Sequence, residues 1–330
     1  MGQPRLVWLL AFAALLFGLA MLSVTIGTRN VAWSELLAAL GGARETIGEA
    51  AVALRLPRTA LAILAGASLG LAGAIMQGIT RNPLADPGLL GVNMGASLAV
   101  AVGVAWFGMS APQAFIWTAI AGAAVAALFV YSVGSLGRGG ATPLKLALSG
   151  AATSVAFASL LLALILPRAD IAGGLQAWQI GGVGGATLAR IMPVLPFLIV
   201  GLLAGLLSAR KLNALALGDE LAAGLGENVA AARAFSALAA VLLCGATTAM
   251  CGPIAFVGLV VPHICRLLVG IDHRWLLPCS TIGGACLLVT ADILGRIVAR
   301  PAEIDVGIVT ALLGAPFFIA IVRRQRVRDL

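Results

Sequence analysis

The stretch that decides the fold runs from Arg55 to Gly95 and has the sequence RLPRTALAILAGASLGLAGAIMQGITRNPLADPGLLGVNMG. Its first part places an arginine pair, Arg55 and Arg58, before an apolar segment. That segment is long enough to cross a bilayer, which takes about 20 apolar residues in a helix. A polar hairpin interrupted by prolines follows. The stretch therefore predicts one complete membrane crossing with a charged end and a turn at its other end.

Pro57 predicts the start of the crossing helix, because proline fits the first turn, where its missing N–H leaves no hydrogen bond unmade. Residues 28–57 then form an outer segment with one short interfacial helix. Arg55 and Arg58 would lie at the positive end of the helix dipole, which is unfavourable by up to about 1 kcal/mol for each cation. An acidic partner docking at this end would explain the placement.

Small residues recur along this helix every four positions, a spacing that allows another helix to approach closely. They are Ala62, Gly66, Gly70, Ala74 and Gly78. Asn82–Pro83 ends the helix, and Asp86–Pro87 predicts the N-cap and first-turn proline of the next one. We expect this hairpin to lie at the inner face of the membrane.

The composition of the whole chain is that of a membrane protein. Of 330 residues, 61% are hydrophobic and 10% are charged, and the mean hydropathy is +1.07, far from the balance of a soluble domain. The net charge is +8. Because no cluster of basic residues contains interleaved aromatics, positive loops explain this charge and nucleic-acid binding is not expected.

Apolar runs of about 20 residues predict ten membrane spans. Their limits are 6–27, 58–79, 92–109, 114–136, 144–166, 191–209, 230–250, 254–270, 275–295 and 304–322. We expect an all-α polytopic membrane protein with a single transmembrane domain over residues 1–330. Ten spans divide into two halves of five, and an odd number in each half makes an internal repeat inverted across the membrane. We expect such a repeat.

The arginines and lysines predict that both termini lie in the cytoplasm. With this orientation thirteen of them face inside and eight face outside, as the positive-inside rule favours. The first apolar run is long and lacks a small-x-small cleavage site, so we expect an uncleaved span.

The sequence shows no recognisable catalytic centre. Its only lysines, Lys145 and Lys211, do not lie in a GxxxxGK[ST] loop, so the chain is not expected to hydrolyse ATP by that route. His263 and His273 have no acidic or cysteine neighbours at ligand spacing, so no metal site is expected. No nucleophile–base pair is present either, and a membrane-embedded enzyme is disfavoured.

Buried polar groups leave a few alternatives open. Asp292 and Arg296 are four residues apart, which favours a structural ion pair over a proton relay. The five cysteines are expected to be small buried hydrophobes, with a disulfide or a metal role as the alternative. Pro316 lies inside the last span, where it either makes the helix discontinuous or produces a packing kink.

The inner segment 210–229, RKLNALALGDELAAGLGENV, predicts two short helices that meet at Gly218 and Asp219. Asp219 is a plausible N-cap of the second helix. Helices this short are not stable alone, so they would gain from docking into the groove of a partner. The alternative is a loop packed on the membrane surface.

The chain resembles, throughout its length, the FecCD-type permease subunits of ABC importers for iron–siderophore complexes, haem and cobalamin. The motifs that carry the resemblance are RLPRT at 55–59, RNPLADPGLLGVN at 81–93, LALGDELAAGLG at 215–226, GPIAFVGLVVPH at 252–263, DHRWLLP at 272–278, ADILGR at 291–296 and GIVTALLGAPFF at 307–318. LSGAATS at 148–154, AWQIGG at 177–182 and CGPIAFVGL at 251–259 are similar to the ferric-enterobactin type of siderophore permease.

The resemblance implies the partners and the sites. It implies a second permease subunit, identical or paralogous, two cytoplasmic ATPase subunits that bind ATP and magnesium, and a periplasmic binding protein that delivers an iron–siderophore ligand. The implied docking residues for the binding protein are Arg55, Arg58 and Arg296. The implied coupling residues are Leu217, Gly218, Asp219 and Glu220, and the implied inner gate lies near Thr142 and Pro143.

The implied function is therefore that of an inner-membrane permease subunit without a cofactor of its own, embedded in lipid. EIDVG at 303–307 departs from the ELPVG of many relatives, and losing that proline should alter the start of the last helix. Two alternatives stay open. One is a haem or cobalamin permease of the same family, and the other is an ion-coupled secondary transporter that needs no ATPase.

Overall fold

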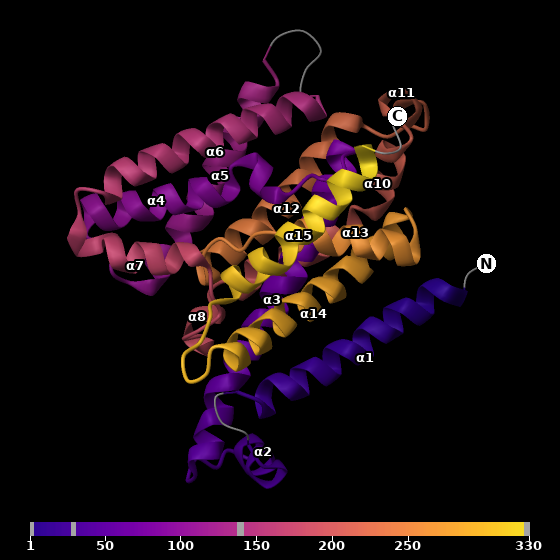
Figure 1. Cartoon of the computed structure of the whole chain (residues 1–330). Coiled ribbons are helices and arrows are strands. Elements are labelled where there is room, and N and C mark those ends of the chain that lie inside the picture. The colour runs from indigo at the N-terminus through magenta and orange to yellow at the C-terminus, as the bar shows by residue number, and fades with distance from the viewer. Residues whose placement is uncertain (1–2, 28–30, 137–141, 327–330) are drawn as a thin grey trace.

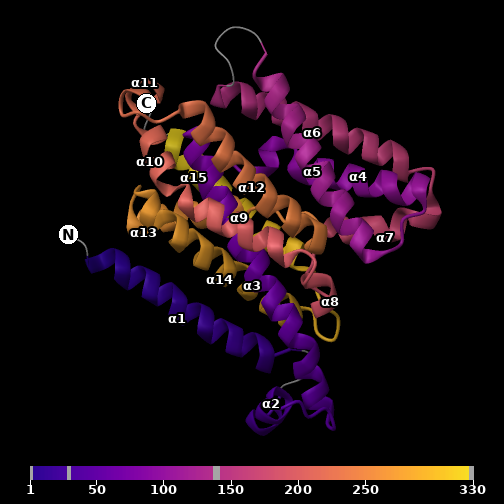
Figure 2. The same cartoon turned by 180° about the vertical axis from the view of Figure 1, so that it is seen from behind.

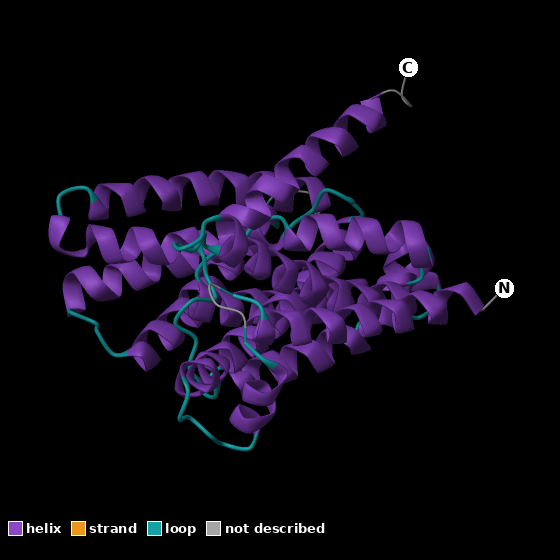
Figure 3. Ribbon diagram, turned by 60° about the horizontal axis from the view of Figure 1, so that its bottom comes forward, coloured by secondary structure: helices purple, strands orange, loops and turns teal. Residues whose placement is uncertain are grey.

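The computed structural model describes residues 3–27, 31–136 and 142–326, and within these ranges the chain forms helices and loops without a strand (Figures 1 and 3). The helices of the first half are α1 (Gln3–Thr25), α2 (Trp33–Leu40), α3 (Ile47–Thr80), the short 3-10 helix η1 (Pro87–Leu90), α4 (Val92–Phe107), α5 (Pro112–Gly134), α6 (Pro143–Ile165) and α7 (Ala169–Ile180). Those of the second half are α8 (Leu188–Ile191), α9 (Leu195–Leu207), α10 (Ala209–Ala216), α11 (Asp219–Gly224), α12 (Val229–Cys251), α13 (Val257–Val269), α14 (His273–Val298) and α15 (Val306–Arg326).

Ten of these units correspond to the ten predicted spans. Six helices are long and apolar enough to cross a membrane, α9 is a further apolar helix from which α10 bends away by 44°, and three shorter apolar helices complete the set in the described residues. The short ones lie in α4, α13 and α15. The all-α polytopic fold is therefore confirmed. The inverted repeat stays a prediction, although the third span of each half, α4 and α13, is a short helix.

Helix α3 is the central element of the bundle. It lies between α14 on one side and α9 and α12 on the other, as the two opposite views show (Figures 1 and 2). From Leu61 to Thr80 nearly every side chain is buried or half-buried. Because α3 is long and central, it touches most other spans and runs from one end of the bundle to the other.

The predicted start of α3 at Pro57 is wrong. The helix begins at Ile47, and its N-cap is Thr46, whose Oγ1 accepts from the Glu49 N–H at 3.2 Å. The Glu49 carboxylate in turn accepts from the Thr46 N–H at 3.1 Å, which completes a capping box. Pro57 thus lies inside the helix, and most of the expected outer segment is the first turns of α3 and the interfacial helix α2.

The predicted small-residue contact joins α3 to α14. Substituents on Gly66 and Gly70 would clash with the backbone of Gly284 and Ser280, respectively. Gly73 lies in the same way against the backbone of Gly258 in α13. Because the backbones themselves touch, no larger side chain fits along these interfaces.

The sequence analysis expected the hairpin after α3 to lie at the inner face of the membrane. In the structure the hairpin does not stay at that end of the bundle. Asp86 caps η1 by accepting from the Gly88 N–H at 2.8 Å, as predicted. However, a Cβ on Gly258 would lie 3.2 Å from Asp86 Oδ2, and Gly258 packs beside Leu69 and Gly73 of α3. Leu69 precedes the end of α3 by about 16 Å at 1.5 Å per residue. The hairpin therefore returns into the bundle before α4 begins.

The remaining expectations about interrupted helices and cysteines are settled by the described residues. Helix α15 continues through Pro316 without a break, so the discontinuous alternative is wrong there. Helix α13 likewise contains Pro262.

All five cysteines are buried with free thiols, as expected of small core residues.

Candidate functional site

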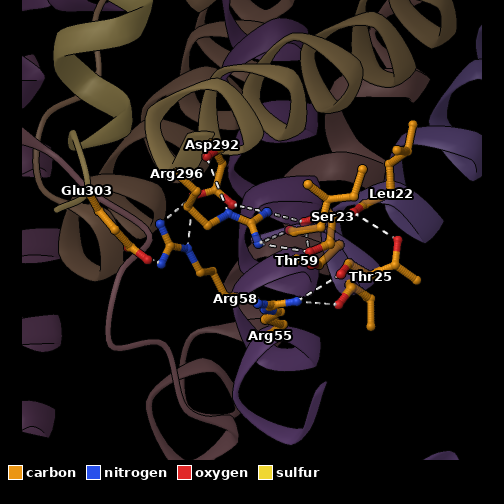
Figure 4. Close-up of polar contacts among 11 residues, drawn as sticks. Leu22, Ser23, Thr25, Arg55, Arg58, Thr59, Asp292, Arg296 and Glu303 are labelled. Carbon is orange, nitrogen blue, oxygen red and sulfur yellow. Dashed lines mark hydrogen bonds and ion pairs between the residues drawn. The ribbon is translucent and has the colours of Figure 1, made fainter. Parts of the chain in front are cut away.

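Six charged residues gather at the end of the bundle that the sequence predicts to face outward, where α1, α3 and α14 meet the loop 299–305 (Figure 4). We call this group the outer arginine cluster. Its members are Arg55, Arg58, Asp292, Arg296, Arg300 and Glu303. The cluster unites all three predicted docking arginines, although they come from two helices that are far apart in the sequence.

Asp292 is the buried centre of the cluster, with a side chain that is 1% exposed. Its Oδ1 accepts from Arg58 through Nε at 2.9 Å and lies 2.8 Å from Arg58 Nη2. Arg296 Nη2 lies 2.9 Å from Asp292 Oδ2, an ion-pair contact without hydrogen-bond geometry. The predicted pair between Asp292 and Arg296 is thus confirmed. Two guanidinium groups compensate one buried carboxylate, which favours a structural pair over a proton relay.

Three arginines of the cluster bind the carboxyl end of α1. Such an end leaves four carbonyls without intrahelical partners and carries the negative end of the helix dipole. The hydrogen bonds run from Arg296 Nη1 to Ser23 O at 2.8 Å and Ile26 O at 3.1 Å, from Arg55 Nη1 to Val24 O and Thr25 O at 3.1 Å each, and from Arg300 to Gly27 O. These guanidinium groups therefore cap α1 and pin it to α3 and α14.

The three predicted docking residues differ in accessibility. Arg55 is 8% exposed and Arg296 is 2% exposed, and both are committed to α1. The Arg58 side chain is 15% exposed, and its Nη1 donates to Glu303 Oε2 at 2.6 Å. Of the three arginines, Arg58 is thus the one that a partner could reach directly, at its contact with Glu303. Arg55 and Arg296 instead hold α1 in place beside it.

Sequence reasoning missed Glu303 and the polar pair Ser23 and Thr59. Ser23 Oγ lies 2.7 Å from Thr59 Oγ1 and also accepts from Arg296 Nη2 at 2.7 Å. No local pattern could have found Glu303, because it is 245 positions from Arg58. Ser23 could have been found from the sequence, because it is a polar residue near the end of an apolar span.

The predicted pair of short helices forms the opposite end of the bundle. Helices α10 and α11 meet at Gly218, whose φ of +110° is a conformation that favours glycine. Gly218, and not Asp219, is the N-cap, so that detail was wrong. Asp219 instead accepts from Arg233 Nη2 at 2.9 and 3.0 Å and pairs with Arg81. We call residues 209–226 the coupling unit, after the role that the sequence analysis expects of them.

The coupling unit presents apolar side chains outward. Leu217, Leu221 and Leu225 are 56%, 63% and 70% exposed, whereas Leu212 and Leu215 are fully buried beneath them. Glu220 is exposed on the same unit. Exposed leucines on a short helical unit that is anchored by buried leucines are expected of a helix that docks into a partner's groove.

A second polar contact fixes the base of the unit. Asn213 donates to Asp272 at 2.7 Å, and Arg5 of α1 lies 3.9 Å from the same carboxylate. Burial alone would raise the pKa of Asp272, but the hydrogen bonds from Asn213 and the Arg274 N–H, together with the charges of Arg274 and Arg5, hold the pKa below its ordinary value. The start of α1 therefore lies at the same end of the bundle as the coupling unit.

The predicted gate residues start α6. Thr142 is the N-cap and accepts from the Lys145 N–H at 3.4 Å, and Pro143 is the first helical residue. The segment 137–141 before them lies outside the described residues. Among the described residues, no group of three or more His, Cys, Asp or Glu side chains is arranged to hold a metal ion.

Comparison with known proteins supplies the family. The model of the FecCD transport family matches residues 14–324. The chain is 46% identical over 307 residues to the ferric enterobactin transport system permease protein of Escherichia coli (strain K12), covering 92% of this chain and 91% of that protein. It is also 46% identical over 274 residues to the iron(3+)-hydroxamate import system permease protein of Bacillus subtilis (strain 168), covering 83% of this chain and 71% of that protein.

A solved structure supports the same assignment. A metal-chelate type ABC transporter in an inward-facing conformation matches with a TM-score of 0.84 and 27% identity, covering 97% of this chain and 99% of that chain. From the family match over nearly its whole length and the identity to curated relatives, the chain belongs to the FecCD transport family.

Proposed function

We propose that this chain is the permease subunit of an ABC importer that moves ferric–siderophore complexes across the inner membrane. The observation that carries the proposal is the 46% identity to a ferric enterobactin permease over 92% of the chain. A siderophore complex passes intact, so the subunit needs no catalytic residue. The energy comes from two ATPase subunits, which bind ATP and magnesium, and a periplasmic binding protein delivers the ligand to a pair of permease subunits.

The two ends of the bundle fit the two kinds of partner. The outer arginine cluster has more arginines than carboxylates, which suits an acidic surface on the binding protein and speeds encounter by long-range attraction. In this proposal Arg58 makes the direct contact, while Arg55 and Arg296 hold its surroundings. The contact of Arg5 with Asp272 supports an orientation in which both the N-terminus and the coupling unit face the cytoplasm.

The coupling unit is the proposed contact with the ATPases. Leu217 and Glu220 are exposed on it, and Gly218 and Asp219 fix the angle between its two helices. Closure of the ATPases on ATP would move this unit, and the spans attached to it would switch the path from outward- to inward-facing. Thr142 and Pro143, at the start of α6, are the proposed inner gate.

Transport by the reconstituted complex tests the proposal. The chain, its ATPases and its binding protein are placed in proteoliposomes, and uptake of an iron-loaded siderophore is compared with uptake of haem and cobalamin. We expect ATP-dependent uptake of the siderophore complex. Preferential uptake of haem or cobalamin would support the alternative within the family, and uptake driven by a proton gradient without ATP would overturn the importer assignment.

A further inference from the structure

We propose that Glu303 is an internal substitute for the partner's acidic residue: it occupies Arg58 in the undocked permease and is replaced by a carboxylate of the binding protein on docking. Glu303 would thereby set the affinity of the outer arginine cluster for its partner. This inference rests on the proposed function, and it assigns a role to a residue that the sequence analysis left without one.

The guanidinium of Arg58 is divided between a fixed and an exposed acid (Figure 4). Its Nε and Nη2 face Asp292, whose side chain is 1% exposed. Its Nη1 faces Glu303, whose side chain is 39% exposed. One side of the guanidinium is therefore anchored in the protein, and the other side points to a carboxylate at the surface.

Glu303 is more exposed than Asp292 and is held by fewer contacts. It lies in the non-helical segment between α14 and α15, where residues 300–303 are all exposed. In the described part of the chain, Arg58 is the only hydrogen-bond donor to its carboxylate. Losing Glu303 therefore breaks one contact and leaves the buried pair of Arg58 and Asp292 intact.

Exchange of one carboxylate for another is energetically balanced. The Arg58 side chain is partly buried, so Glu303 stabilises its Nη1 while no partner is bound. A docking carboxylate restores an ion pair at Nη1, whereas an apolar or basic partner surface would displace Glu303 and leave Nη1 without an acid, with Asp292 still paired to the other side of the guanidinium. The Arg58–Glu303 pair therefore selects for an acidic partner. It also weakens the binding of that partner, because the partner's carboxylate must first displace Glu303 from Arg58.

The test measures binding of the binding protein to the full importer in nanodiscs. Glu303→Gln removes the competing charge, and we expect the Kd to fall about two- to fivefold, the range that an exposed ion pair is worth. The matched control is Asp305→Asn, which removes a charge two residues away on the same exposed segment without touching Arg58. Its Kd should stay near that of the unchanged importer.

The outcomes separate this inference from the proposed docking site. If Arg58→Glu weakens binding but Glu303→Gln leaves the Kd unchanged or raises it, the docking site stands and the exchange is wrong. Equal tightening by Glu303→Gln and Asp305→Asn would also overturn the exchange, because general charge would then explain the effect. If Arg58→Glu leaves binding unchanged, the docking site itself is wrong. Glu303→Asp keeps the charge on a shorter side chain and should give an intermediate Kd.

Discussion

Arg81, the C-cap of α3, binds Asp219 at the start of α11, and through Nε it also donates to the Leu215 carbonyl at 2.7 Å. The central helix is thus tied to both helices of the coupling unit. From Arg58 to Arg81 the same helix spans about 35 Å at 1.5 Å per residue. A single continuous element therefore connects the outer arginine cluster to the proposed ATPase contact.

Arg81→Ala should uncouple transport from ATP hydrolysis. Without Arg81, the coupling unit keeps its Arg233 contact and the packing of α10 on α3, but it loses the ion pair with Asp219 and the hydrogen bond to the Leu215 carbonyl. We expect uptake in proteoliposomes to fall by at least about tenfold, which corresponds to 1.4 kcal/mol, while basal ATP hydrolysis continues and no longer responds to the binding protein. Arg81→Lys, which keeps the charge, should restore part of the response.

Arg274→Ala is the matched control for Arg81, since Arg274 is an exposed arginine at the same end of the bundle and lies outside the coupling unit. It should leave both uptake and the response to the binding protein unchanged. Equal losses in the two variants would point to net charge at this end of the bundle and would contradict a specific role of Arg81.

Arg58→Glu should abolish uptake and leave membrane insertion intact. Reversal of this charge places a carboxylate beside Asp292 and opposes an acidic partner. Uptake is measured together with the amount of inserted, correctly folded protein. Arg44→Glu changes another exposed outer arginine and serves as the control, with uptake expected near normal. Normal uptake by Arg58→Glu would remove the docking assignment.

Part of this architecture followed from local sequence signals. The ten spans came from the lengths of apolar runs, and the pair of Asp292 and Arg296 came from a spacing of four residues, which the helix turns into a contact. The junction at Gly218 came from a glycine between two short leucine-rich segments. These features depend on residues that are neighbours in the chain.

The features that the sequence did not predict correctly depend on tertiary packing, or on a second local pattern that competes with the one used. Thr46 and Glu49 carry a capping-box pattern, which is a stronger start signal than Pro57, and overlooking it misplaced the start of α3. The return of the hairpin into the bundle follows from the contact of Asp86 with Gly258, which no local pattern encodes. The contact between Arg58 and Glu303 is likewise a product of the assembled fold.

Gly70→Ala should destabilise the bundle. Its new methyl group would meet the Ser280 carbonyl, and backbone atoms cannot move aside as a flexible side chain can. Overpacking of this kind costs about 1–3 kcal/mol, which a thermal unfolding scan in detergent would record as a lower Tm. Gly174→Ala is the control, because Gly174 lies in α7 with open space around it. It should leave the Tm unchanged or raise it slightly.

Arg296→Ala should act on stability before it acts on docking. Arg296 is 2% exposed. Its removal leaves Asp292 with one cation and takes the Arg296 donor from the carbonyls of Ser23 and Ile26 at the end of α1. Breaking a buried pair in this way costs about 3–5 kcal/mol. We expect a lower Tm and less inserted protein. Arg58→Glu also takes one cation from Asp292 but leaves every donor to α1 in place, so its loss of stability should be smaller, and binding of the binding protein per inserted molecule should fall. A normal Tm with weakened binding in Arg296→Ala would instead make Arg296 a direct docking residue, and Arg296→Lys, which keeps one donor for α1, should recover much of the lost stability.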